Sequence, residues 1–184
     1  MIKKERLSTS TMALVALMTA MICIVAPFTI PIGAVPISLA TLVLYFVAYI
    51  LGWKKGCLAC LLYLLIGFVG IPVFSGFSGG VGKLFGATGG YFFGYLLLVW
   101  ITGWFAEHFS GKKIFYFLGM LLGTAACYAV GTAWFVYVAK AGITAAVTAC
   151  ILPFIPGDLI KMAVAVVMAP AVRGRLVKAG YVKR

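Results

Sequence analysis

The chain has 184 residues, of which 65% are hydrophobic and 10% are charged, whereas soluble domains have about 45–50% apolar and about 25% charged residues. This composition excludes a soluble globular domain, and it excludes a disordered chain because disorder requires low hydrophobicity. Apolar residues run in long unbroken stretches, which argues against the alternating pattern of a transmembrane barrel. The sequence therefore predicts an all-α membrane protein in which residues 1–184 form a single domain.

Basic residues strongly outnumber acidic ones, with fifteen Lys and Arg against three Asp and Glu and a formal net charge of +12. The acids are Glu5, Glu107 and Asp158. The basic residues stand in short clusters between apolar segments, a pattern that is typical of cytoplasmic loops in membrane proteins. We therefore expect a chain embedded in a lipid bilayer, and we expect no nucleic-acid partner.

The apolar segments predict six transmembrane helices, since about 20 residues are needed to cross a bilayer. The first segment follows a charged N-terminus as in a signal peptide, but another membrane segment comes directly after it, so we interpret it as a retained helix. The basic stretches GWKKG and EHFSGKK mark turns, and prolines open the sixth helix. The expected helices cover residues 11–28, 37–51, 57–69, 91–106, 114–138 and about 156–172.

The distribution of basic residues predicts that both termini are cytoplasmic. With this orientation, twelve of the fifteen Lys and Arg fall in the termini and the inner turns. The outer loops hold only Lys83 and Lys140, and Lys161 falls within the sixth helix. This asymmetry follows the positive-inside rule.

The segment Ile71–Gly90, between the third and fourth expected helices, is rich in glycine and is expected on the external side. Irregular backbone at membrane depth is tolerated where protein buries it or where it lines a cavity, and glycine lets the backbone approach a ligand closely. We therefore expect this loop, including Gly79 and Gly80, to contribute to a ligand site; a flexible connector is the alternative. The aromatic side chains expected to enclose an apolar ligand are Phe74, Phe77, Phe85 and Tyr91.

Nucleotide-binding patterns fail in the same loop, although GGVGK resembles part of a phosphate loop. The Walker pattern requires a glycine where Phe77 stands and a hydroxyl residue where Leu84 stands. A dinucleotide fingerprint that starts at Gly80 would need a glycine in place of Phe85. The chain is therefore expected to have no means of its own to use ATP.

Metal and cofactor sites are not expected either. The five cysteines are an odd number, and most of them fall within apolar segments where they serve as small hydrophobic residues. Cys57 and Cys60 form a CxxC pair, but the single histidine, His108, lies far along the chain, so no tetrahedral metal site is predicted.

Asp158 is the one acid outside the two cytoplasmic positions, and Lys161 follows it one turn later in the sixth helix. Ionisable residues within a membrane span are costly, so they usually face the protein interior and mark a site. A spacing of three places both on one helix face. We expect them to present an acceptor and a donor to a polar ligand; the alternative is an internal ion pair near the interface, with Lys161 directed outward.

Helix one carries a stripe of small residues that includes Ala16 and Ala20, four residues apart. This spacing permits close helix contact, either within the chain or with a partner subunit.

Three segments of the chain resemble the BioY family, the biotin-specific substrate-binding (S) subunits of energy-coupling-factor (ECF) transporters. The segments are IPIGAVPISL, VFSGFSGGVGKLFGATGGY and PFIPGDLIK, and the resemblance extends over nearly the whole chain. Ala87 stands where the family pattern has proline.

The resemblance implies a six-helix subunit in a bacterial or archaeal cell membrane that binds biotin from outside with high affinity. It also implies partners that energise transport: a transmembrane coupling protein and two cytoplasmic ATPases. By the same resemblance, Asp158 and Lys161 match the ligand-binding pair, Ser78 contributes a polar contact, and Ala16 and Ala20 dock on the coupling protein.

Two other functions remain as alternatives: an S subunit for another vitamin, thiamin or riboflavin, and an intramembrane enzyme. The enzyme is disfavoured because one histidine and one intramembrane acid provide no catalytic constellation. We therefore expect a transporter subunit without catalytic residues.

Overall fold

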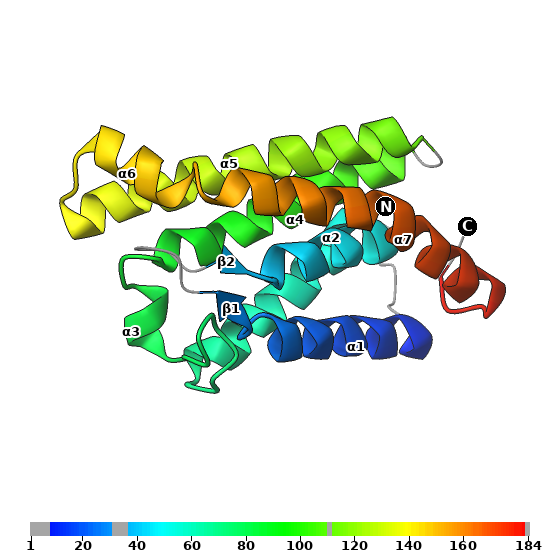
Figure 1. Ribbon diagram of the computed structural model, residues 1–184. Helices are drawn as coiled ribbons and strands as arrows, with labels where there is room; N and C mark the ends of the chain where they lie inside the picture. Colours follow the sequence, from blue (N-terminus) through cyan, green and yellow to red (C-terminus); the bar gives the residue numbers. More distant parts are fainter. Residues whose placement is uncertain (1–7, 31–36, 110–111, 183–184) are drawn as a thin grey trace, which may run out of the picture.

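Helices make up most of the computed structural model, which describes residues 8–30, 37–109 and 112–182 (Figure 1). A two-residue strand pair follows the first helix, with Thr29 opposite Ser38 and Ile30 opposite Ile37 in antiparallel register. The elements in chain order are α1 Thr9–Val25, β1 Thr29–Ile30, β2 Ile37–Ser38, α2 Ala40–Phe68, α3 Val81–Leu84, α4 Gly89–His108, α5 Lys113–Ala139, α6 Ile143–Cys150 and α7 Phe154–Lys178.

Among the described residues, four helices are long and apolar enough to cross a membrane, namely α2, α4, α5 and α7. Helix α1 is equally apolar but has 17 residues. At 1.5 Å per residue, the 20 residues of α4 extend about 30 Å, which is about the thickness of the hydrocarbon core. The structure thus agrees with the all-α membrane protein predicted from composition.

Helix α2 is two helical segments joined at Gly52, where φ is 74° and ψ is −176°. A Cβ atom placed on Gly56 would lie 3.7 Å from the Cα atom of Ala48, although eight residues of straight helix span about 12 Å. The chain therefore folds back on itself, as Figure 1 shows for the cyan segment. The sequence predicted a turn over GWKKG, but a single residue makes it, because glycine adopts positive φ without steric cost.

The ends of α1 follow from local chemistry. The Ser8 hydroxyl accepts a hydrogen bond from the backbone N–H of Thr11 at 3.2 Å and caps the helix, so α1 begins two residues earlier than expected. It ends at Val25, short of the expected Phe28, because Pro27 has no backbone N–H with which to continue the helical hydrogen bonds.

The glycine-rich segment is more ordered than a flexible connector. Its Phe74 side chain is fully buried and packs against Tyr63 and Phe92, with ring centroids 5.5 and 4.3 Å away. The backbone N–H of Phe74 donates to the Ser78 carbonyl at 2.8 Å, and α3 forms one helical turn after the loop. Phe74 therefore anchors this segment to α2 and α4.

Helices α4 and α5 lie side by side and approach closely through glycines. A Cβ atom on Gly94 of α4 would lie 2.8 Å from the Cys127 sulfur of α5, and one on Gly123 of α5 would lie 2.9 Å from the Leu98 carbonyl oxygen. Such small residues let helix backbones approach in a membrane, where dispersion contacts drive association.

The C-terminal part of the chain contains more helix than expected. Helix α6 occupies a stretch for which no helix was predicted, and α7 continues to Lys178 instead of ending near Val172. Arg175 and Lys178 lie in its last turn, where the negative end of the helix dipole stabilises positively charged side chains.

Candidate ligand-binding site

Asp158 and Lys161 lie in the first half of α7 and are both buried. The Lys161 ammonium is 2.8 Å from Asp158 Oδ1, so the spacing of three residues does bring the two charges together on one face of the helix. Lys161 is directed into the bundle and not outward. Burying this ion pair is costly unless its remaining donors and acceptors also form hydrogen bonds. The energy of the buried pair therefore depends on the residues around it.

The ammonium of Lys161 has two further partners near the start of α2. It donates to the Ser38 carbonyl oxygen at 2.7 Å and to the Thr41 hydroxyl at 3.1 Å. An ammonium has three protons, and with Asp158 these three acceptors use all of them. Lys161 therefore fastens α7 to the junction of β2 and α2.

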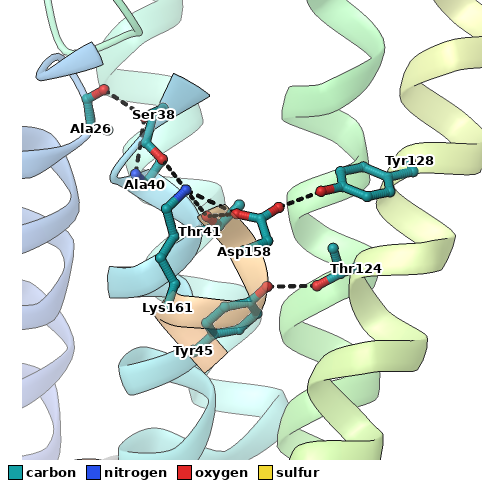
Figure 2. A network of polar contacts seen from close by, with 9 residues as sticks. All are labelled: Ala26, Ser38, Ala40, Thr41, Tyr45, Thr124, Tyr128, Asp158 and Lys161. Carbon is teal, nitrogen blue, oxygen red and sulfur yellow. Dashed lines mark hydrogen bonds and ion pairs between the residues drawn. The ribbon is translucent and has the colours of Figure 1, made fainter. Parts of the chain in front are cut away.

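The carboxylate of Asp158 is held from two other helices. Thr41 of α2 donates to Oδ1 at 3.1 Å, and the Tyr128 hydroxyl of α5 donates to Oδ2 at 2.5 Å. Figure 2 shows these residues converging on Asp158 from α2, α5 and α7. Charge-assisted hydrogen bonds of this kind are about twice as strong as neutral ones, so the network holds three helices in a fixed relation.

Ser38 connects this network to the end of α1. Its hydroxyl donates to the Ala26 carbonyl at 2.9 Å and accepts from the backbone N–H of Ala40 at 3.0 Å (Figure 2). Beneath the network, the hydroxyls of Tyr45 and Thr124 lie 2.6 Å apart and join α2 to α5.

A cavity of about 50 Å³ adjoins the network. Its wall is mixed: hydroxyl side chains and the Asp158–Lys161 pair supply polar groups, and several aromatic side chains are among the apolar lining residues. The lining residues are Ser38, Thr41, Ser75, Thr88, Tyr91, Phe92, Tyr95, Leu98, Thr124, Cys127, Tyr128, Phe154, Asp158 and Lys161. An apolar pocket with a few convergent polar groups is the usual form of a small-molecule site.

The comparisons with known proteins agree on one family. The model of the BioY family matches residues 1–178. The chain belongs to the BioY family.

Curated relatives of this family member come from bacteria and archaea. "Biotin transporter BioY2" of Lactococcus lactis is 35% identical over 151 residues, which are 82% of this chain and 83% of that protein. "Probable biotin transporter BioY" of Pyrococcus horikoshii is 35% identical over 162 residues, or 88% of this chain and 95% of that protein.

A solved structure is similar to the whole bundle. It is described as the crystal structure at 2.1 Å of the S-component for biotin from an ECF-type ABC transporter, and the TM-score is 0.83 at 30% sequence identity. The match covers 89% of this chain and 90% of that one. The helices of this chain are therefore arranged in the same tertiary fold as those of that S-component.

Of the aromatic residues predicted to enclose a ligand, Tyr91 lines the cavity of this BioY-family member. Its hydroxyl lies 3.2 Å from that of Thr132 and 3.3 Å from the Cys150 carbonyl, to which it donates. Phe74 is not among the lining residues and belongs to the packed core. Phe77 and Phe85 are exposed and lie against Phe28 and Phe93.

Ser78, Gly79 and Gly80 do not line the cavity. The Ser78 hydroxyl donates to the carbonyl of Ser75 at 2.8 Å, and Ser75 itself lines the cavity. A Cβ on Gly79 would lie 2.4 Å from the Ile71 carbonyl oxygen, and Gly80 donates its N–H to the Gly67 carbonyl at 2.7 Å. These residues shape the loop that brings Ser75 to the cavity.

Sequence reasoning missed Thr41, Tyr128 and Thr124 as pocket residues. Tyr128 and Thr124 are four residues apart on α5, and the regular spacing of two hydroxyl side chains in an apolar span was an available signal. Thr41 had no such signal, because its partners lie 117 and 120 residues further along the chain.

Ala16 and Ala20 lie on the exposed side of α1, opposite the buried Leu14, Met18 and Ile22. Within the described residues, these alanines are therefore available to another helix.

Proposed function

We propose that this chain is the biotin-binding S component of an ECF-type transporter, which captures biotin from outside the cell and passes it through an ATP-driven partner module. The proposal rests on one observation above all: a buried Asp158–Lys161 pair, joined by Thr41 and Tyr128, forms the polar wall of an otherwise apolar cavity. The named relatives and the similar S-component support biotin as the ligand.

The chemistry of biotin complements this wall. Its cyclic urea has two N–H donors and a carbonyl acceptor, its thioether ring is apolar, and its tail ends in a carboxylate. Asp158 accepts from a urea N–H, while Lys161 donates to a carbonyl or a carboxylate oxygen. The rings of Tyr91, Phe92 and Tyr95 offer an apolar surface to the thioether ring.

The cavity must enlarge to admit this ligand. Small-molecule sites usually enclose about 300–1,000 Å³, which is far more than the about 50 Å³ beside Asp158. The hydroxyl contacts that now hold Asp158 and Lys161 can be exchanged for contacts with the urea, so that no buried charge loses its partners on binding.

The proposed topology has six crossings with both termini in the cytoplasm. The six crossings are α1, the two segments of α2 on either side of Gly52, α4, α5 and α7. Ser75 and Thr88 bring the glycine-rich connection to the cavity, so an external position of this connection gives biotin access from outside. Lys54, Lys55 and Arg173 then lie on the cytoplasmic side, as the positive-inside rule requires.

The energising partners in this proposal are a transmembrane coupling protein and two cytoplasmic ATPases. The exposed small side chains of Ala16 and Ala20 suit close contact with a helix of the coupling protein. The host is proposed to be a bacterium or an archaeon, and the chain to lie in its cell membrane.

Isothermal titration of the detergent-purified chain tests the ligand. We expect saturable, one-to-one binding of biotin and no comparable binding of thiamin or riboflavin. Tighter binding of either of these two vitamins would overturn the proposal.

A further inference from the structure

A second cavity lies at the end of the bundle where α1 begins and α4 ends; on α2 it is lined from Ile50 onward, whereas the first cavity is lined by Thr41 of the same helix. Its volume is about 320 Å³, and its wall is about equally polar and apolar. In Figure 1 this is the end where the first turn of α1, the fold-back of α2 and the last turns of α7 meet. None of its lining residues belongs to the Asp158–Lys161 pocket.

Three charged side chains from three helices line this cavity: Lys55 of α2, Glu107 of α4 and Arg173 of α7. Within the described ranges, Asp158–Lys161 is the ion pair that the structure shows, so these three charges are not paired with one another. Arg173 is held at the wall because it donates to the Tyr49 carbonyl at 3.3 Å and lies 5.6 Å above the Tyr49 ring. The cavity thus presents two separate cations and one anion to whatever occupies it.

Further donors surround the two cations. Ser8, the N-cap of α1, and Thr11 of its first turn line the cavity, with hydroxyls 2.9 Å apart, and Tyr181 of the C-terminal segment lines it as well. The N-terminal end of a helix also carries a partial positive charge. These groups favour an anionic oxygen near Lys55 and Arg173, while the exposed Glu107 carboxylate favours a cation or a donor.

The lining residues stand at the ends of their helices, which places the cavity near the membrane surface. Glu107 is one residue from the end of α4, Gly52 is the turn of α2, and Thr11 lies in the first turn of α1. Large apolar side chains of the same helices remain exposed, including Met12 of α1 and Met168 of α7, which are 52% exposed each. A molecule that fits this arrangement has a charged head and apolar tails.

We propose that this cavity binds the headgroup of an aminophospholipid, phosphatidylethanolamine, in the cytoplasmic leaflet. The phosphate lies between Lys55 and Arg173, and the ammonium of the ethanolamine lies against the Glu107 carboxylate. Basic pockets between transmembrane helices on this side of a membrane bind the phosphate-bearing headgroups of anionic lipids, and Glu107 adds a carboxylate to such a pocket here. The carboxylate favours phosphatidylethanolamine, because its ammonium brings positive charge and N–H donors together, whereas phosphatidylcholine brings charge without an N–H and phosphatidylglycerol brings hydroxyl donors without positive charge.

Native mass spectrometry tests this assignment: the full chain is mixed in detergent with defined phospholipids, and the lipids that remain bound after the detergent is removed are identified. We expect one phosphatidylethanolamine to be retained in preference to phosphatidylcholine. Lys55→Gln should weaken its retention by about tenfold, since one charged contact is lost. Lys54→Gln is the matched control, because Lys54 is the neighbouring lysine, is exposed and does not line the cavity.

Glu107→Gln should change the preference between phosphatidylethanolamine and phosphatidylglycerol. Phosphatidylethanolamine should bind about tenfold more weakly to this variant, and phosphatidylglycerol at least as well as to the unchanged chain. Soluble phosphoethanolamine should compete only weakly, because it lacks the apolar tails. Biotin titration of each variant is expected to be unchanged, since these residues lie outside the Asp158–Lys161 pocket.

Three outcomes would overturn the proposal. Equal losses in Lys54→Gln and Lys55→Gln would mean diffuse attraction to a basic surface. Equal retention of phosphatidylcholine and phosphatidylethanolamine would remove the role of Glu107. Competition by soluble phosphoethanolamine at the affinity of the lipid would mean that the site binds a free phosphate compound.

Discussion

The hydroxyl of Tyr128 on α5 donates a hydrogen bond to Oδ2 of Asp158 on α7, and Tyr128 lines two cavities of the bundle. On one side is the cavity that Lys161 and Thr41 also line. On the other side is a groove of about 220 Å³ between α5 and α7, whose wall is almost entirely apolar and includes Leu121 and Met162. This contact orients the carboxylate where the pocket and the groove share lining residues.

Tyr128→Phe removes the donor and keeps the ring. We expect biotin to bind about tenfold more weakly, because Asp158 loses a charge-assisted hydrogen bond and is less well oriented. Isothermal titration measures the change. Tyr137→Phe is the matched control, since Tyr137 lies on the same helix and is 82% exposed. Equal affinities of the unchanged chain and Tyr128→Phe would show that this contact has no part in binding.

Asp158→Ala and Lys161→Ala each leave a buried charge without its partner, which costs about 1–3 kcal/mol or more. Biotin affinity should fall at least about tenfold in both variants. Asp158→Asn keeps an acceptor but removes the charge, so the loss of affinity in this variant measures the part due to charge, and the further loss in Asp158→Ala measures the part due to the acceptor. Lys178→Ala is the control, because Lys178 is an exposed lysine on the same helix. Unchanged affinity in both alanine variants would reduce the pair to a structural role.

Ala16→Trp and Ala20→Trp test the docking face of α1. Both positions are exposed, so the isolated variants should fold and bind biotin normally. A large side chain there should prevent close helix contact, at a cost of about 1–3 kcal/mol by analogy with overpacked cores. We expect loss of biotin uptake and of co-purification with the coupling protein.

The control for this face is Ala163→Trp, at an exposed alanine of α7. It should retain uptake and co-purification. If Ala16→Trp and Ala20→Trp also transport biotin, the docking surface lies elsewhere on the chain.

The six-crossing topology predicts where inserted reporters are found. A reporter after Arg184, or one between Gly103 and Lys113, should be cytoplasmic, whereas one between Gly76 and Gly82 should be external. Reporter activity on the two sides of the membrane measures this directly, and an external C-terminus would contradict the topology.

The sequence by itself determined the class of the protein, because the length and hydrophobicity of an apolar segment are local properties. It also determined that Asp158 and Lys161 share a face, since a spacing of three residues has this consequence in any α-helix. The family resemblance was carried by local segments as well, and the match of the BioY model over residues 1–178 confirmed it.

Only the tertiary structure decided which side chains complete the pocket. Thr41 and Tyr128 reach Asp158 across 117 and 30 residues of chain, and no periodic pattern records such a contact. It also placed Phe74 in the core rather than in the cavity wall. The sequence could not distinguish these two positions, because an apolar side chain suits both. Local patterns specify helices and their buried faces, whereas the partners of a buried charge depend on how those helices pack.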